Sequence, residues 1–187
     1  MLKIFDGAMG TMLQAHGLTN RDCPEYFAIS HPEVVADIHR QYRAVGADIL
    51  ETNSFGGSAL KLAHFGLSDD TEKINAAAAR VARSAANGAL VAGSVGPSGR
   101  LLAPLGEQDF DEAAESFARQ MRGLEQGGVD FLLIETIIDL QEMRAALLAA
   151  KSVTRLPVFC QFSFDENGRT VTGTDPETAT CVVTALG

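Results

Sequence analysis

The sequence predicts an α/β fold in which buried parallel strands alternate with helices. Short, continuous apolar runs are typical of parallel strands that are covered on both faces. The first residues of successive runs are 46, 42, 41 and 27 positions apart, which suits one strand, one helix and loops in each unit. Five such runs recur along the chain: Leu2–Phe5, Asp48–Thr52, Leu90–Val95, Phe131–Thr136 and Val158–Phe162.

A near-repeat within two of these runs indicates where chemistry is done. Residues 46–53 read GADILETN and residues 128–136 read GVDFLLIET, so Glu51 and Glu135 each end an apolar strand. A buried carboxylate is costly unless it meets a partner or a ligand. In barrels of alternating strands and helices, the carboxyl ends of the strands carry the active site. The pattern therefore predicts an enzyme, although an ion pair between Glu135 and an arginine is the structural alternative.

The helices between the runs have recognisable starts and ends. Pro32 and Pro176 stand at first-turn positions, and Asp175 is a good N-cap. Gly88 follows an Ala-rich helical stretch as a candidate C-terminal cap. Helical spacing of apolar residues covers 70–87, 109–126 and 139–152.

The spacing alone leaves two architectures open. A closed eight-strand barrel needs about 250 residues, and the 187 residues here would hold about its first five strand-helix units. The alternative is an open, doubly wound sheet of five parallel strands. The turn after the first run, DGAMGT, has glycines only at positions 7 and 10, so it lacks the dinucleotide-binding fingerprint.

Composition excludes several function classes. A net charge of −9 without a basic stretch argues against a nucleic-acid partner. No apolar run reaches 18 residues, so no membrane span is expected. Three widely spaced cysteines predict a reducing cytoplasm rather than a disulfide framework, and no local metal-binding motif is visible.

Polar residues gather in the loops after the predicted strands. Asp6–Thr11 places two glycines before a helix start, where free backbone amides suit a carboxylate or phosphate; a tight turn capped by Asp6 is the alternative. Asn53 and Ser94 stand where the next two strands end, next to loops that also suit helix capping or a simple turn. The four histidines are scattered, and each is expected at the surface.

Several segments, in order, resemble the homocysteine S-methyltransferase family, and most of all its cobalamin-dependent members. They are DGAMGTML, GADILETNSFGG, LVAGSVGPSGRLLAPLG, GVDFLLIETIIDLQEMRAAL and FDENGRTVTGTDPE, and the resemblance covers essentially all 187 residues. The resemblance implies a (β/α)8 TIM barrel, of which this chain is the N-terminal portion. It also implies a cytoplasmic enzyme of methionine biosynthesis that transfers a methyl group to the zinc-bound thiolate of homocysteine. The methyl donor would be methylcobalamin on other modules.

The resemblance also implies roles for individual residues. Backbone amides of Gly7, Ala8, Met9, Gly10 and Thr11 would hold the homocysteine carboxylate. Glu135 would receive the ammonium group with Asp6 nearby, and Asn53 and Ser94 would line the pocket.

The zinc cysteines of the family have no counterpart in this chain. They lie after the sixth strand and near the eighth, whereas Cys23, Cys160 and Cys181 match neither position. We therefore expect a homocysteine-binding fragment that is inactive alone and that can dimerise through open barrel edges. A non-catalytic amino-acid-binding half-barrel and an assembly partner that completes a barrel with a second chain are the alternatives.

Overall fold

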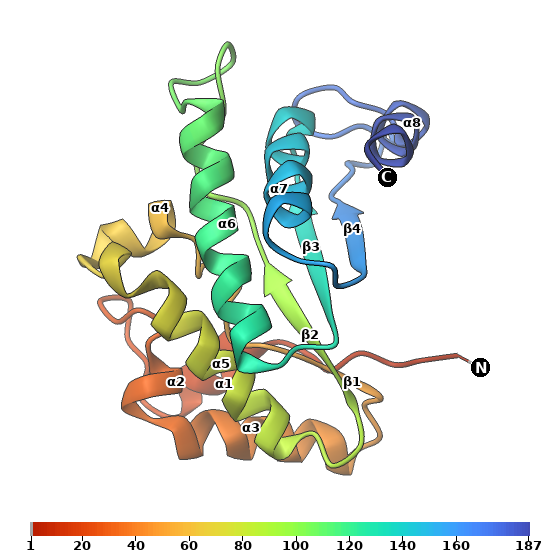
Figure 1. Cartoon of the computed structure of the whole chain (residues 1–187). Helices are drawn as coiled ribbons and strands as arrows, with labels where there is room; N and C mark the ends of the chain where they lie inside the picture. Colours follow the sequence, from red (N-terminus) through yellow and green to blue (C-terminus); the bar gives the residue numbers. More distant parts are fainter. Residues whose placement is uncertain (1) are drawn as a thin grey trace.

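The computed structural model describes residues 2–187, and its helices and strands alternate along the chain (Figure 1). The elements are α1 (Met9–Ala15), α2 (Phe27–Ser30), α3 (Pro32–Ala44), β1 (Ile49–Glu51), α4 (Ala59–Leu62), η1 (Ala63–Phe65), η2 (Ser68–Asp70), α5 (Thr71–Ala85), β2 (Leu90–Val95), α6 (Phe110–Gly127), β3 (Phe131–Ile137), α7 (Leu140–Val153), β4 (Val158–Phe162) and α8 (Pro176–Leu186).

The four strands form one parallel sheet in the order β1-β2-β3-β4. Helices α5, α6 and α7 lie along one face of this sheet (Figure 1). Each long helix returns the chain to the start of the next strand, as a parallel connection requires. The expected α/β fold is therefore confirmed. None of the helices in residues 2–187 is long and apolar enough to cross a membrane.

Helix starts follow the capping residues that the sequence offers. The Asp109 carboxylate accepts hydrogen bonds from the first-turn amides of α6, and Asp139 and Asp175 do the same for α7 and α8. Such caps satisfy amides that have no partner inside the helix. Helix α5 ends at Ala85, and Gly88 follows with a φ of +84°, a conformation that favours glycine.

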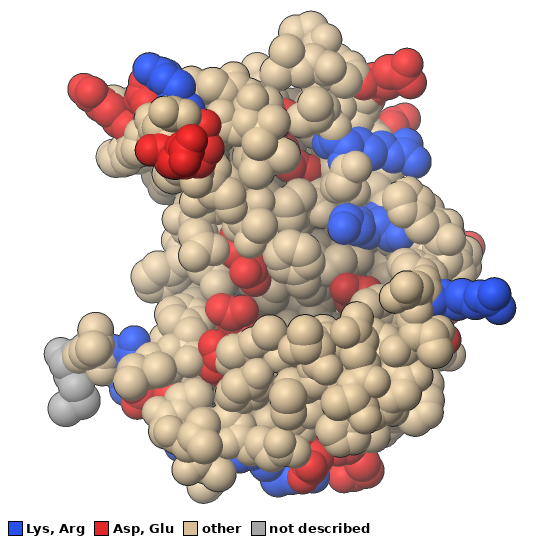
Figure 2. Space-filling view, turned by 180° about the vertical axis from the view of Figure 1, so that it is seen from behind, with Lys and Arg blue, Asp and Glu red and all other residues tan. Residues whose placement is uncertain are grey.

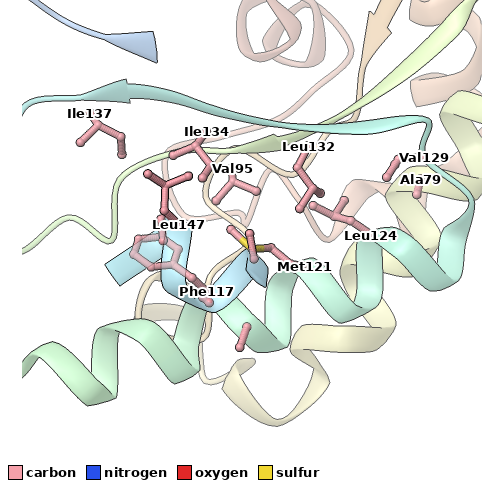
Figure 3. Close-up of a cluster of buried hydrophobic side chains, with 14 of the residues drawn as sticks. Ala79, Val95, Phe117, Met121, Leu124, Val129, Leu132, Ile134, Ile137 and Leu147 are labelled. Atoms are coloured by element: carbon pink, nitrogen blue, oxygen red, sulfur yellow. The ribbon is translucent and has the colours of Figure 1, made fainter. Parts of the chain in front are cut away.

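The main core fills the space between the sheet and the helices. Phe117, Met121 and Leu124 of α6 point toward Leu132 and Ile134 of β3 (Figure 3). All five side chains are buried. This packing fixes which face of each strand is turned toward the helices and which face is left for the site.

The first apolar run is not a regular strand. Within 2–5, only Phe5 makes a bridge, a parallel one to Ile49, although the amide of Asp6 also donates to the Ile49 carbonyl at 3.0 Å. Leu2 and Ile4 are exposed, because this segment has a strand neighbour on one side only. The run thus occupies the place of a strand beside β1 without forming a ladder.

Candidate functional site

An open pocket of about 520 Å³ lies at the carboxyl ends of the strands. None of its described lining residues is a Lys or Arg, and acidic side chains are visible in the hollow of the face shown in Figure 2. The lining residues are Asp6, Gly7, Ala8, Met9, Gly10, Pro24, Glu25, Glu51, Thr52, Asn53, Ser54, Phe55, Ser94 and Glu135. Eight of the nine residues predicted to bind substrate are in this lining, and Thr11 is absent from it.

Strand alternation aims the polar side chains at this pocket. Side chains on a strand point alternately to the two faces. Ile49, Ala92, Phe131 and Leu133 form a small apolar cluster on the face away from the helices. Glu51, Ser94 and Glu135 follow these residues at intervals of two, so they continue the same face up to the strand ends.

A β-bulge keeps Glu135 on this face. Ile134 pairs with Cys160 and Ile137 with Phe162, so β3 has one more residue than β4 in this interval. Thr136 takes up the extra residue with a φ of +61°. Ile137 thereby returns to the main core, where it is fully buried, while Glu135 still faces the pocket.

Hydrogen bonds fix two of the carboxylates. Ser94 Oγ donates to Glu135 Oε1 at 2.6 Å, and the Glu51 amide donates to Asp6 Oδ1 at 3.0 Å. The Asp6 side chain is only 2% exposed, and His39 Nδ1 lies 3.7 Å from its second oxygen. Asp6 therefore ties the start of the chain to β1 instead of capping α1.

Burial, together with the grouping of carboxylates, raises the pKa values of Glu51 and Glu135. Burial raises the pKa of Glu51 to about 8, and the nearby charges of Glu135 and Asp6 add to the shift. Burial also raises the pKa of Glu135, as does Asp6, against the lowering effect of the Ser94 hydrogen bond. A cationic ligand group would relieve this repulsion, so the pocket favours a positive charge.

The loop before α1 brings backbone amides to the same pocket. The N-cap of α1 is Ala8, whose side chain offers no hydrogen bond, so the first amides of the helix lack a side-chain cap. A Cβ atom on Gly7 would lie 2.9 Å from the Tyr42 ring, and Tyr42 Oη donates to the Ala8 carbonyl at 2.9 Å. Glycine at position 7 is what allows this close approach. Thr11 lies within α1 and is exposed.

Asn53 is held by the chain rather than free to turn. Its Nδ2 donates to the Pro24 carbonyl at 2.7 Å, and the residue is 6% exposed. Nearby, Thr52 Oγ1 accepts from the Ser94 amide, and Ser54 Oγ donates to the Ser94 carbonyl. The loop after β1 is thus bonded to the end of β2, and this fixes the pocket wall.

Some functional candidates carry little signal in the sequence. Glu25 is buried and lines the pocket, where it accepts hydrogen bonds from the Gly56 amide and Cys23 Sγ. It follows no strand, so strand-end reasoning misses it.

The expectation that all four histidines are surface residues is wrong for His39, which is fully buried. Its position four residues after buried Val35 on α3 was the available signal.

The described residues offer no ligand set for the zinc that the resemblance implies. Residues 2–187 contain no group of three or more His, Cys, Asp or Glu placed to hold a metal ion. Cys23 is buried, Cys160 lies half-buried in β4, and Cys181 is exposed on α8. Burial raises the pKa of the Cys23 thiol to about 12 and that of Cys160 to about 11, which disfavours the thiolates that zinc needs.

Comparison with known families identifies the family of this chain. The model of the family described as homocysteine S-methyltransferase matches residues 3–186. The chain belongs to the homocysteine S-methyltransferase family. This membership agrees with the resemblance noted in the sequence, because four of the five segments that carry it contribute residues to the pocket lining.

Relatives of this family member include much longer proteins. A methionine synthase from Mycobacterium tuberculosis is 32% identical over 97% of the chain. The chain spans 17% of the length of that relative.

The fold is also that of solved family structures. The homocysteine methyltransferase MmuM from Escherichia coli, in its oxidized form, matches with a TM-score of 0.87 and 22% identity. That match covers 99% of this chain and 70% of the MmuM chain. The metallated form matches with a TM-score of 0.81 and 24% identity, over 99% of this chain and 71% of the other. These likenesses concern the fold, and the fold is that of part of such a barrel.

Proposed function

We propose that this chain is the homocysteine-binding part of an enzyme that transfers a methyl group to the sulfur of homocysteine, giving methionine. The observation that carries the proposal is the juxtaposition of Asp6, Glu51 and Glu135 with the uncapped amides at the start of α1. An amino acid is a zwitterion, and a site for it needs negative charge for the ammonium group beside donors for the carboxylate.

In this proposal, Glu135 receives the ammonium group with Asp6 beside it. Backbone amides of residues Gly7–Thr11, in the loop before α1 and in its first turn, receive the carboxylate, and Asn53 and Ser94 complete the walls. Ionised Glu135 is the better partner for an ammonium group, and the Ser94 hydrogen bond favours that form. When the ammonium and carboxylate groups are held in place, the shape of the pocket determines where the homocysteine sulfur points.

The metal and the methyl donor lie outside what these residues supply. Bound zinc lowers the pKa of a thiol and so provides a thiolate nucleophile at neutral pH. The described residues hold the substrate's amino-acid end and contribute no ligand set to that metal. A zinc site elsewhere in a longer protein, a methylcobalamin donor and a cytoplasmic location stay predictions from the family resemblance.

Calorimetry with truncated ligands tests the proposal. L-homocysteine should bind more tightly than 4-mercaptobutanoate, which lacks the ammonium group, and more tightly than 3-mercaptopropylamine, which lacks the carboxylate. Glu135→Gln should weaken homocysteine binding about 10- to 100-fold, the range for a charged hydrogen bond. Glu166→Gln, at an exposed position, is the matched control.

The comparison of homocysteine with methionine separates enzyme from binding module. A site that serves methyl transfer should bind the substrate homocysteine more tightly than the product methionine. Equal affinities for homocysteine and methionine without zinc would support a non-catalytic amino-acid-binding protein. Equal affinities for homocysteine and both truncated ligands would contradict the proposal altogether.

A further inference from the structure

His39 is a buried polar side chain that the fold does not use. It lies on the inner side of α3 and is fully buried, and neither of its ring nitrogens has a hydrogen-bond partner among residues 2–187. A buried polar group without a partner costs folding free energy, so a leucine of similar volume would be the more stable choice. A residue that lowers stability in this way calls for an explanation outside packing.

The Asp6 carboxylate lies close to the ring of His39. His39 Nδ1 lies 3.7 Å from Asp6 Oδ2, and the two side chains are 0% and 2% exposed. The other oxygen of Asp6 accepts from the Glu51 amide. Asp6 therefore stands between β1 on one side and α3 on the other, and the residue lines the pocket.

His39 itself does not line the pocket, so any effect on a ligand passes through Asp6. The 3.7 Å separation is longer than a hydrogen bond, and such contacts in free proteins often tighten only when the ligand is bound. A donor behind Asp6 would hold its carboxylate in the orientation that faces an incoming ammonium group. It would also moderate the repulsion of Asp6 toward Glu51 and Glu135, which otherwise raises the pKa of both.

We infer that His39 is a positioning residue: its Nδ1–H holds the Asp6 carboxylate toward the ammonium group of the substrate. The inference rests on the proposed function for the identity of the ligand, whereas the contact between His39 and Asp6 can be tested without any ligand.

The ligand-free test is the tautomer of His39. Free neutral histidine favours the Nε2–H form, so a proton on Nδ1 is the signature of a donor contact to Asp6. Long-range proton–nitrogen NMR on ¹⁵N-histidine-labelled protein should find Nδ1 protonated in the wild type. Asp6→Asn should change that signal, and the exposed His64 provides an internal reference. An unprotonated Nδ1 in the wild type would overturn the inference.

The binding test uses His39→Leu and His39→Asn with two ligands. Leucine removes the donor, whereas the asparagine amide places one close to the Nδ1 position. His39→Leu should weaken L-homocysteine binding roughly tenfold, as loss of a supporting hydrogen bond does in other sites. Its affinity for 4-mercaptobutanoate should not change, and its melting temperature should not fall. His39→Asn should restore most of the homocysteine affinity.

The outcomes separate this inference from the proposed function. If His39→Leu lowers the affinity for both ligands equally, or for neither, His39 has a purely structural role. If wild-type protein does not distinguish homocysteine from 4-mercaptobutanoate, the proposed function fails. In that case the claim that His39 acts on ligand binding fails as well. The tautomer measurement still decides whether His39 donates to Asp6.

Discussion

Ser94 and Glu135 are joined across neighbouring strands by a hydrogen bond of 2.6 Å from Ser94 Oγ to Glu135 Oε1. Ser94 is buried at the end of β2, and Glu135 is half-buried near the end of β3. The bond favours the ionised carboxylate, whereas burial and Asp6 oppose ionisation. Ser94 therefore influences how strongly Glu135 can attract a cation at neutral pH.

Replacing Ser94 by alanine should weaken homocysteine binding at pH 7. Loss of the hydrogen bond raises the pKa of Glu135 further, so less of it is ionised at a given pH. We expect a loss of about 3- to 10-fold, the value of one ordinary hydrogen bond, and a shift of the binding optimum to higher pH. Calorimetry between pH 6 and 9 measures both. Ser84→Ala, at an exposed serine of α5, is the control; an unchanged pH profile in Ser94→Ala would contradict the prediction.

Replacing Glu51 by glutamine should stabilise the protein at pH 8 and not at pH 5. The folded pKa of Glu51 is raised from 4.5 to about 8, so the folded state binds the proton more tightly than the unfolded state. The wild type therefore loses stability as pH rises from about 5 through about 8. After allowance for solvent screening, the gain in Glu51→Gln should be about 3 kcal/mol at pH 8.

Urea unfolding at both pH values tests this difference, with Glu166→Gln as the exposed control. A gain of the same size at pH 5 would mean that the effect comes from packing and not from the proton.

Replacing Gly7 by alanine should be far more damaging than replacing Gly10. A Cβ atom at position 7 would meet the Tyr42 ring at 2.9 Å, whereas one at position 10 would meet nothing within 4 Å. Overpacking of this kind costs about 1–3 kcal/mol. Gly10→Ala lies within α1 and should be neutral or gain up to about 1 kcal/mol from helix propensity. Thermal melting of the two variants side by side decides it, and equal melting temperatures would refute the expectation.

Thr136 holds strain that a change of residue should release. A β-branched residue at a φ of +61° costs on the order of 1–2 kcal/mol, whereas asparagine tolerates this region. Thr136→Asn should therefore raise the free energy of unfolding by about 1 kcal/mol. Thr136→Val keeps the branched side chain and should bring no gain. If both variants or neither are stabilised, the strain at the bulge is not the cause.

The order of elements and most of the site can be predicted from the chain. Apolar runs of strand length and capping residues such as Asp109 and Asp175 are local patterns. They depend on neighbouring residues only, so they predict the same elements that the folded chain contains. The near-repeat ending in Glu51 and Glu135 predicts a pocket at the strand ends for the same reason, because parallel strands align their carboxyl ends. The first run is the exception: Leu2 and Ile4 have the composition of a buried strand but are exposed.

The sequence by itself determined the strand-helix rhythm, the helix caps and the kinds of side chain at the strand ends. Only the tertiary structure decided which of these groups meet. The bulge at Thr136 keeps Glu135 facing the pocket while Ile137 enters the core, and the packing of α3 sets His39 behind Asp6. Both depend on contacts between residues distant in the chain, and a pattern of neighbouring residues does not encode such contacts.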